Sequence, residues 1–125
     1  MKYLLQKILN SCIALVLALG PVGVFAEADG PDFYQVTKVA KGDVLNIRSA
    51  PNGHAQKVGE IPPDGTCLRN LGCQGGLSFK EYSTLSAPQR KLRLKQNPRW
   101  CKVEYQGITG WALGTFLAES GRPCP

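Results

Sequence analysis

The stretch from residue 100 to residue 116 constrains the fold of this chain more than any other. From Trp100 to Tyr105 the side chains alternate with the two-residue period of a β-strand, so one set can face a core while the other faces solvent or a groove. Gln106-Gly107 then marks a tight turn. In the next short strand, Gly110 permits the close approach of a neighbouring chain, and Trp111 offers a large apolar surface for burial. The stretch therefore predicts two strands joined by a turn.

Four earlier segments have the same short-strand pattern, and Gly- and Pro-containing turns separate them. In the segment 44–48, Leu45 and Ile47 alternate with polar residues and are candidates for the core. The other three segments are 33–39, 58–61 and 66–71. The chain is thus expected to be mainly β, and its core to include three aromatic residues of the C-terminal part, Tyr105, Trp111 and Phe116.

The N-terminus has the pattern of a secretory signal peptide. Lys2 and Lys7 precede an apolar run over residues 8–19, and the segment ends with small residues at the positions that signal peptidase reads. We expect residues 1–26 to be cleaved off after Ala26, which places the mature protein in the periplasm or outside the cell. A retained membrane anchor is the alternative, but the run is short for a bilayer span, which needs roughly 20 residues. No stable membrane span is therefore expected.

Four cysteines remain after the signal: Cys67, Cys73, Cys101 and Cys124. An even number of cysteines in an exported chain indicates disulfides. Of the three possible pairings we favour Cys73 with Cys101 and Cys67 with Cys124. The reason is that antiparallel pairing of the strand from residue 66 with the strand up to residue 105 would place Cys73 opposite Cys101. A metal site is the alternative, but the cysteine spacing is unusual for one and no histidine is near, so we expect none.

Several of these elements together resemble a bacterial SH3 domain. The matching segments are G-D-V-L-N-I-R-S-A-P-N from Gly42, V-G-E-I-P-P-D-G-T from Val58, W-C-K-V-E-Y from Trp100 and G-I-T-G-W-A-L-G-T-F-L from Gly107. The resemblance implies a small five-stranded SH3-like β-barrel for residues 33–119. A flexible leader, 27–32, would precede this domain, and a tail, 120–125, tied by Cys124, would follow it. The resemblance also implies a binding module, because SH3-type domains bind extended peptides in a groove lined with aromatic side chains.

Residues 72–98 depart from the family pattern, in which a short loop joins the strands. Ser78 is followed three residues later by Glu81, and Ser86 by Gln89, which is the capping-box pattern of a helix start. We expect two short helices inserted between the second and third barrel strands. By the resemblance this is the n-Src loop, which flanks the ligand groove. A small apolar cluster would join the helices, built from Phe79, Tyr82, Leu85 and Leu92.

Positive charge is concentrated in the same insertion. Of the 15 Lys and Arg residues, Lys2 and Lys7 belong to the signal, which leaves 13 against 9 Asp and Glu. Seven basic residues and one acidic residue lie between Lys80 and Lys102. This is either a solvated helix face or an attraction to anionic envelope polymers, lipid headgroups or an acidic protein. Nucleic acid is not an expected partner of an exported chain that has no nucleic-acid motif, and a monomer is expected.

Two surfaces are candidates for binding. The first is the SH3-type groove, with Trp100 as its floor unless this side chain only covers the end of the barrel. Arg48, Asn52 and His54 would lie on the other side of that groove. The guanidinium of Arg48 suits a carboxylate, unless it forms a salt bridge with Asp43 or Glu104. The second surface is the basic side of the insertion, formed by Arg90, Lys91, Arg93 and Lys95.

The groove predicts a non-catalytic extracytoplasmic module that recognises cell-wall peptide or another envelope ligand. The basic surface predicts instead a protein-interaction or inhibitor protein that docks on an envelope protein. Catalysis is not expected. The single histidine after the signal, His54, lies in a predicted loop rich in Pro, Asn and Gly, the four cysteines are expected to form disulfides, and no Gly-rich phosphate loop is present. We therefore expect a non-enzyme without a cofactor.

Overall fold

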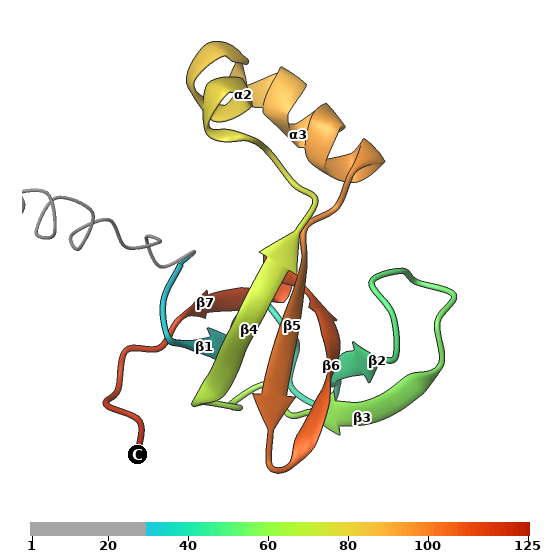
Figure 1. Cartoon of the computed structure of the whole chain (residues 1–125), viewed down its shortest axis with the longest axis vertical. Helices are drawn as coiled ribbons and strands as arrows, with labels where there is room; N and C mark the ends of the chain where they lie inside the picture. Colours follow the sequence, from blue (N-terminus) through green and yellow to red (C-terminus); the bar gives the residue numbers. More distant parts are fainter. Residues whose placement is uncertain (1–29) are drawn as a thin grey trace, which may run out of the picture.

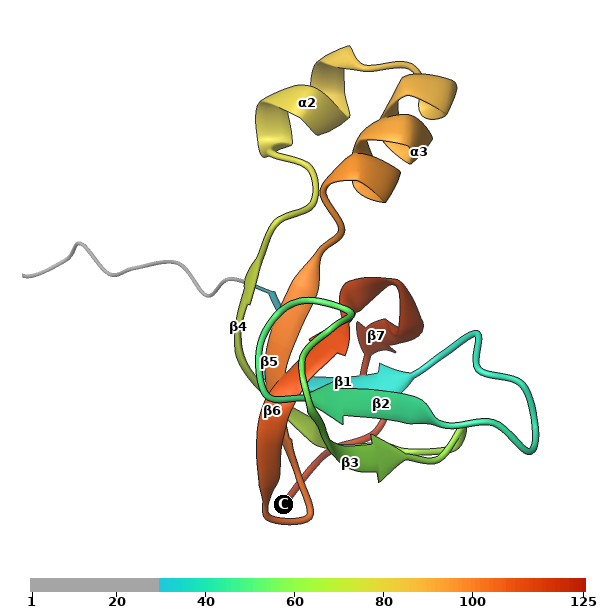
Figure 2. The same cartoon turned by 90° about the vertical axis from the view of Figure 1, so that its right-hand side faces the viewer.

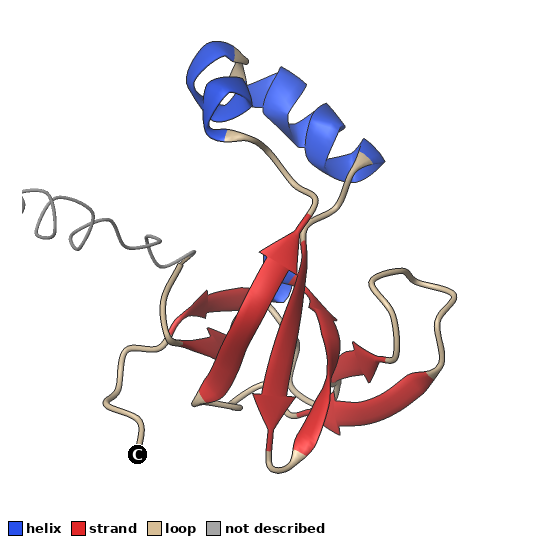
Figure 3. Ribbon diagram, viewed as in Figure 1, coloured by secondary structure: helices blue, strands red, loops and turns tan. Residues whose placement is uncertain are grey.

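Seven short strands follow the alternation of apolar side chains in a computed structural model that describes residues 30–125 (Figure 1). The predicted signal peptide, residues 1–26, and the first half of the leader, residues 27–29, lie outside the described residues. Two helices lie between the fourth and fifth strands, and one 3-10 turn precedes the last strand (Figure 3). The elements are β1 (Phe33–Val36), β2 (Leu45–Arg48), β3 (Lys57–Ile61), β4 (Leu68–Gln74), α2 (Phe79–Thr84), α3 (Ala87–Gln96), β5 (Trp100–Tyr105), β6 (Ile108–Leu113), η1 (Gly114–Phe116) and β7 (Leu117–Glu119).

The strands form one antiparallel sheet in the order β3-β2-β6-β5-β4-β1-β7. The predicted mainly β class is confirmed, but the number of strands differs from the expected five. The edges of the sheet are β3, which corresponds to the predicted segment 58–61 and pairs with β2, and β7, which pairs with β1 and was not predicted as a separate strand. The position of the insertion is also corrected: it lies between the fourth and fifth strands of the chain rather than between the second and third.

A single core holds the sheet together, and every strand contributes to it. Its buried members are Tyr34 and Val36 of β1, Leu45 and Ile47 of β2, Ile61 of β3, Leu68 of β4, Cys101 and Val103 of β5, Ala112 of β6 and Leu117 of β7. A flat sheet could not bring side chains from all seven strands into one cluster. The sheet therefore curls, and β1, β2 and β3 run across the direction of β4 and β5 (Figure 2).

The aromatic residues of the C-terminal part behave differently from one another. Tyr105 and Phe116 are partly buried and pack against the core, as expected. Trp111 does not belong to the core cluster, because its neighbours Gly110 and Ala112 are the buried residues of β6 and successive side chains of a strand point to opposite faces. The large apolar ring at this position is therefore on the outer face of the sheet.

Gly110 marks the closest approach between strands, as the sequence predicts. A methyl group at this position would lie 2.6 Å from Ile47 Cγ2 and 2.7 Å from the carbonyl oxygen of Arg48. We expect Gly110→Ala to lower the free energy of unfolding by about 1–3 kcal/mol, because β2 or β6 must shift to admit it. Urea unfolding measures this loss. Gly53→Ala is the matched control, since nothing lies within 4 Å of its added methyl, and an equal loss in both variants would contradict the packing account.

Both predicted disulfides are present. Cys73 lies opposite Cys101 in the β4–β5 ladder and is bonded to it, which joins the two strands at the base of the insertion. Cys67, directly before β4, is bonded to Cys124 across a separation of 57 residues. The C-terminal tail is also held by hydrogen bonds from the amides of Ser120 and Gly121 to β1.

The inserted helices α2 and α3 start where the sequence predicts. Ser78 and Ser86 are N-caps, and each forms a complete capping box, with Glu81 and Gln89 respectively. The two helices form a hairpin that projects away from the sheet on the ends of β4 and β5 (Figures 1 and 2). No helix in residues 30–125 has the length and apolar character to cross a bilayer.

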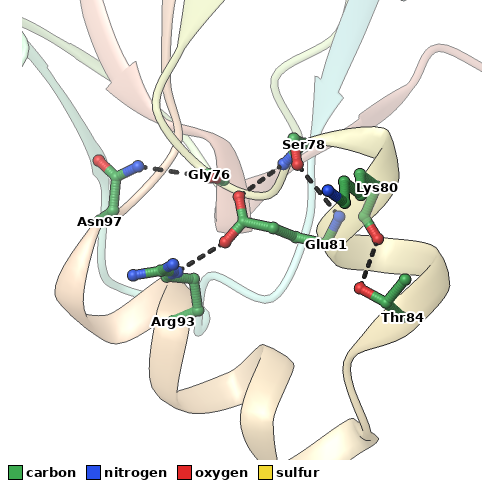
Figure 4. A network of polar contacts seen from close by, with 7 residues as sticks. All are labelled: Gly76, Ser78, Lys80, Glu81, Thr84, Arg93 and Asn97. Carbon is green, nitrogen blue, oxygen red and sulfur yellow. Dashed lines mark hydrogen bonds and ion pairs between the residues drawn. The ribbon is translucent and has the colours of Figure 1, made fainter.

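Polar contacts, rather than an apolar cluster, join α2 to α3. The expected cluster is wrong: neither helix has a buried residue, and Phe79 is 88% exposed. Instead Arg93 Nε donates to Glu81 Oε2 at 2.6 Å (Figure 4). Arg90 donates to two carbonyl oxygens at the end of α2 and lies 5.0 Å from the Tyr82 ring centroid. The helices are too short and too polar to form a second core, so charged hydrogen bonds take its place.

Candidate ligand pocket

An open pocket of about 380 Å³ lies on one side of the sheet. Three parts of the chain line it: the connection between β1 and β2, strand β2 itself, and the meeting point of β5, β6 and η1. The lining residues are Lys38, Val39, Ala40, Asp43, Val44, Leu45, Asn46, Arg48, Trp100, Leu113 and Phe116. The pocket thus combines apolar side chains with three charged ones.

Trp100 lies in this pocket and is only 8% exposed. It opens β5 and pairs with Gln74 of β4 and Leu113 of β6. The next residue, Cys101, is also buried, although the two side chains point to opposite faces of the strand. Trp100 therefore packs outside the main core, where Leu113 and Phe116 line the same pocket. Its ring forms a mostly covered floor rather than an open platform.

Two of the three charged side chains of the pocket, Arg48 and Asp43, already form a hydrogen bond with the backbone. Arg48 Nη1 donates to the carbonyl oxygen of Ala55 at 3.0 Å, which ties the β2–β3 loop to β2. Asp43 Oδ1 accepts from the amide of Val44 at 2.8 Å. Neither salt bridge considered for Arg48 forms: Glu104 pairs with Arg69 at 3.4 Å, and no ion pair joins Arg48 to Asp43 within residues 30–125. Both cations of the pocket, Arg48 and Lys38, retain donors that a bound carboxylate can accept from.

Only part of the predicted groove is brought together. Trp100 and Arg48 line the same pocket, whereas Asn52 and His54 do not. The side chain of Asn52 accepts from the amide of His54 at 3.0 Å, so it shapes the exposed β2–β3 loop. The sequence did not single out Lys38, Val39 or Leu113. Lys38 has a φ of 61°, in the left-handed region. Glycine or asparagine usually indicates such a conformation in a sequence, and a lysine does not.

The predicted basic surface of the insertion is divided in two. Arg90 and Arg93 are engaged in joining α2 to α3. Lys91 and Lys95 are exposed, and their ammonium groups make no hydrogen bond or ion pair within residues 30–125. The hydrogen bond from Arg93, followed by that from the Ser78 amide, holds the pKa of Glu81 below its usual range.

The lowered pKa of Glu81 predicts a pH dependence of the hairpin. A carboxyl whose pKa is lower in the folded state contributes stability above its unfolded pKa, and that stability is lost as pH falls through the folded pKa. We expect the contact with Arg93 to persist at pH 4.5, the usual pKa of Glu, and to open at lower pH. NMR resonances of Arg93 Nε–H and the Glu81 amide report this change. Glu81→Gln, which keeps a capping side chain without the charge, should remove the titration, and an unchanged profile would contradict the assignment.

Comparison with known proteins shows which family the chain matches. The family described as bacterial SH3 domain matches residues 43–118, which include β2 to β6, the inserted helices and most of the pocket. Comparisons with curated proteins and with solved structures found no match. The family match extends over more than half of the chain, and the protein therefore belongs to the bacterial SH3 domain family.

Proposed function

We propose that the protein is a non-catalytic extracytoplasmic binding module that holds cell-wall peptide, or an envelope ligand of similar chemistry, in the pocket over Trp100. The observation that carries the proposal is the grouping of this aromatic floor with Lys38 and Arg48 in a site of about 380 Å³. A volume above roughly 300 Å³ is typical of pockets that bind small ligands. Two disulfides and membership of a family of binding modules support the same conclusion.

The pocket suits a short extended peptide that carries a carboxylate. Apolar contact would come from Val39, Leu113 and Phe116, next to Trp100. A carboxylate would accept hydrogen bonds from Lys38 or from the free donors of Arg48. Asp43, at the same rim, would favour an amine on the ligand and disfavour a second carboxylate. Wall peptides combine carboxylates and amines in this way, which is why we favour them over a uniformly anionic polymer.

The absence of catalysis is part of the proposal. His54 is exposed on the β2–β3 loop and does not line the pocket, and all four cysteines after the predicted signal are bonded in pairs. Within residues 30–125, no three His, Cys, Asp or Glu side chains gather as a metal site would require. The pocket therefore offers groups that bind and orient a ligand but no pairing of nucleophile and base.

Co-sedimentation with purified peptidoglycan tests the proposal. We expect binding that persists at roughly 0.5 M salt, where the screening length is about 4 Å, because the pocket contacts are short-range. Lys38→Glu should weaken binding about tenfold, since it removes one cation and adds a like charge to the ligand carboxylate. Lys41→Glu is the matched control: Lys41 is exposed on the same β1–β2 connection but does not line the pocket.

Two results would count against the pocket. If Lys38→Glu and Lys41→Glu weaken binding equally, net charge rather than the pocket is responsible. If the unchanged protein loses all binding at the higher salt, the interaction is adhesion between charged surfaces. Trp100→Phe is the third binding variant. It makes the aromatic surface of the pocket floor smaller, and an aromatic ring still fills most of the space.

A further inference from the structure

The hairpin of α2 and α3 has apolar side chains that remain more than half exposed. Phe79 is 88% exposed, Tyr82 62% and Leu92 58%, and neither helix contributes a residue to the core. The hairpin stands clear of the sheet on a narrow neck (Figure 1). There the amide of Gly76 donates to the carbonyl of Asn97 at 2.9 Å, and the side-chain amide of Asn97 donates to the carbonyl of Gly76 at 3.4 Å (Figure 4). Three large apolar side chains exposed on one small hairpin make it a candidate interaction surface.

The charge of the hairpin is uncompensated. Its only acidic side chain, Glu81, already pairs with Arg93. Lys80, Lys91 and Lys95 are exposed and make no side-chain hydrogen bond or ion pair with any residue from 30 to 125. Every charge that the hairpin offers to a partner is therefore positive, so the partner surface must be anionic.

The positions of the apolar side chains on the hairpin indicate whether its partner is a membrane or a groove in a protein. A helix that docks in a groove presents a stripe with spacings of three and four residues. In α3 the two leucines, Leu92 and Leu94, are two residues apart and so lie on opposite sides of the helix. Leu94 lines a small pocket with Leu113 at the base of the hairpin, whereas Leu92 lines one with Leu85 near α2. In α2, Phe79 and Tyr82 are three residues apart, but no more than one of the two leucines of α3 can extend their stripe, so no single stripe includes all the apolar groups of the hairpin.

We propose that the hairpin is a peripheral docking surface for an anionic phospholipid membrane. Phe79 and Tyr82 are exposed on α2, the helix that also contains Lys80, as in interfacial segments in which aromatic rings enter the headgroup region and ammonium groups contact lipid phosphates. The membrane does not require one stripe, because a fluid surface adapts to apolar groups spread over both helices. Binding is weak and reversible, since so few apolar groups enter the bilayer.

Vesicle co-sedimentation with the protein exported and oxidised by a bacterial host tests this proposal. Mass spectrometry first establishes that residues 1–26, which contain an apolar run of their own, are absent. The probes are vesicles of phosphatidylglycerol with phosphatidylcholine, and vesicles of phosphatidylcholine alone. We expect binding to the anionic vesicles only. Lys91→Glu with Lys95→Glu should weaken it at least about 30-fold, and Phe79→Ser about tenfold.

The matched control reverses two exposed charges away from the hairpin, with Lys41→Glu and Arg122→Glu, and should change vesicle binding about threefold at most. Equal losses in the control and in the lysine pair would overturn the proposal, because net charge would then explain the binding. So would a protein that binds neither vesicle, and an acidic protein surface would become the partner to examine. The vesicles contain no wall material, so this outcome is independent of the peptidoglycan experiment.

Discussion

Replacing Cys67 and Cys124 together by alanine is expected to lower the free energy of unfolding by about 4 kcal/mol. The bond closes a loop with a sequence separation of 57 residues, and opening it restores the conformational freedom of that loop mainly in the unfolded chain. Both cysteines are only partly buried, so little packing is lost with the sulfur atoms. The effect therefore reports loop entropy with little contribution from a cavity.

Urea unfolding of the oxidised protein, followed by circular dichroism, measures this loss. The comparison is Cys73→Ala with Cys101→Ala, which opens a loop about half as long, with a separation of 28 residues. Loop entropy alone predicts a loss about 0.6 kcal/mol smaller for this second pair. Because Cys101 is fully buried, the measured loss also contains a packing contribution. A loss below about 1 kcal/mol for the first pair would show that the remaining hydrogen bonds of the tail suffice to hold it.

Trp100→Ala is expected to cost about 3–5 kcal/mol of stability. The ring is 8% exposed and fills the space where β5, β6 and η1 meet, so truncation leaves a cavity beneath the ligand pocket. Small domains have only about 5–15 kcal/mol in total, so this variant is close to unfolding at ordinary temperature. Loss of ligand binding in Trp100→Ala would consequently say little about contact with the ligand, which is why the binding series uses Trp100→Phe.

The second tryptophan provides the matched control. Trp111 is partly exposed and lies on the outer face of β6, outside the core cluster. We expect Trp111→Ala to cost about 1–2 kcal/mol, because only part of its surface is removed from water. Thermal or urea unfolding of both variants gives the comparison. A larger loss of stability in Trp111→Ala than in Trp100→Ala would contradict this account, because it would mean that Trp111 is the more deeply buried of the two.

Much of this fold follows from local patterns that the sequence displays directly. The two capping boxes lie where a serine is followed three residues later by Glu or Gln. The pairing of Cys73 with Cys101 follows from strands that run antiparallel, and the remaining pair then follows by elimination. These features depend on hydrogen bonds and spacings within a few residues, or on one strand register, so they can be predicted without knowing how the sheet curls.

The ligand pocket was predicted only in part, because it joins segments that are distant in the chain. Arg48 and Trp100 were identified by residue type. Lys38 reaches the same site through a turn with a positive φ, and Asn52 is directed instead to the amide of His54. Which of these polar side chains face the pocket depends on the path of the β1–β2 and β2–β3 connections, and residue type does not specify that path.

The sequence by itself determined the alternation of the strands, the helix starts, the disulfide partners and the excess of positive charge in the insertion. Only the tertiary structure decided which large apolar groups became buried. Trp111 faces outward because Gly110 and Ala112 take the inward positions of β6, and Phe79 stays exposed because the hairpin projects from the sheet. The physical reason is that periodicity separates two faces of an element, whereas the packing of distant elements decides which face is covered.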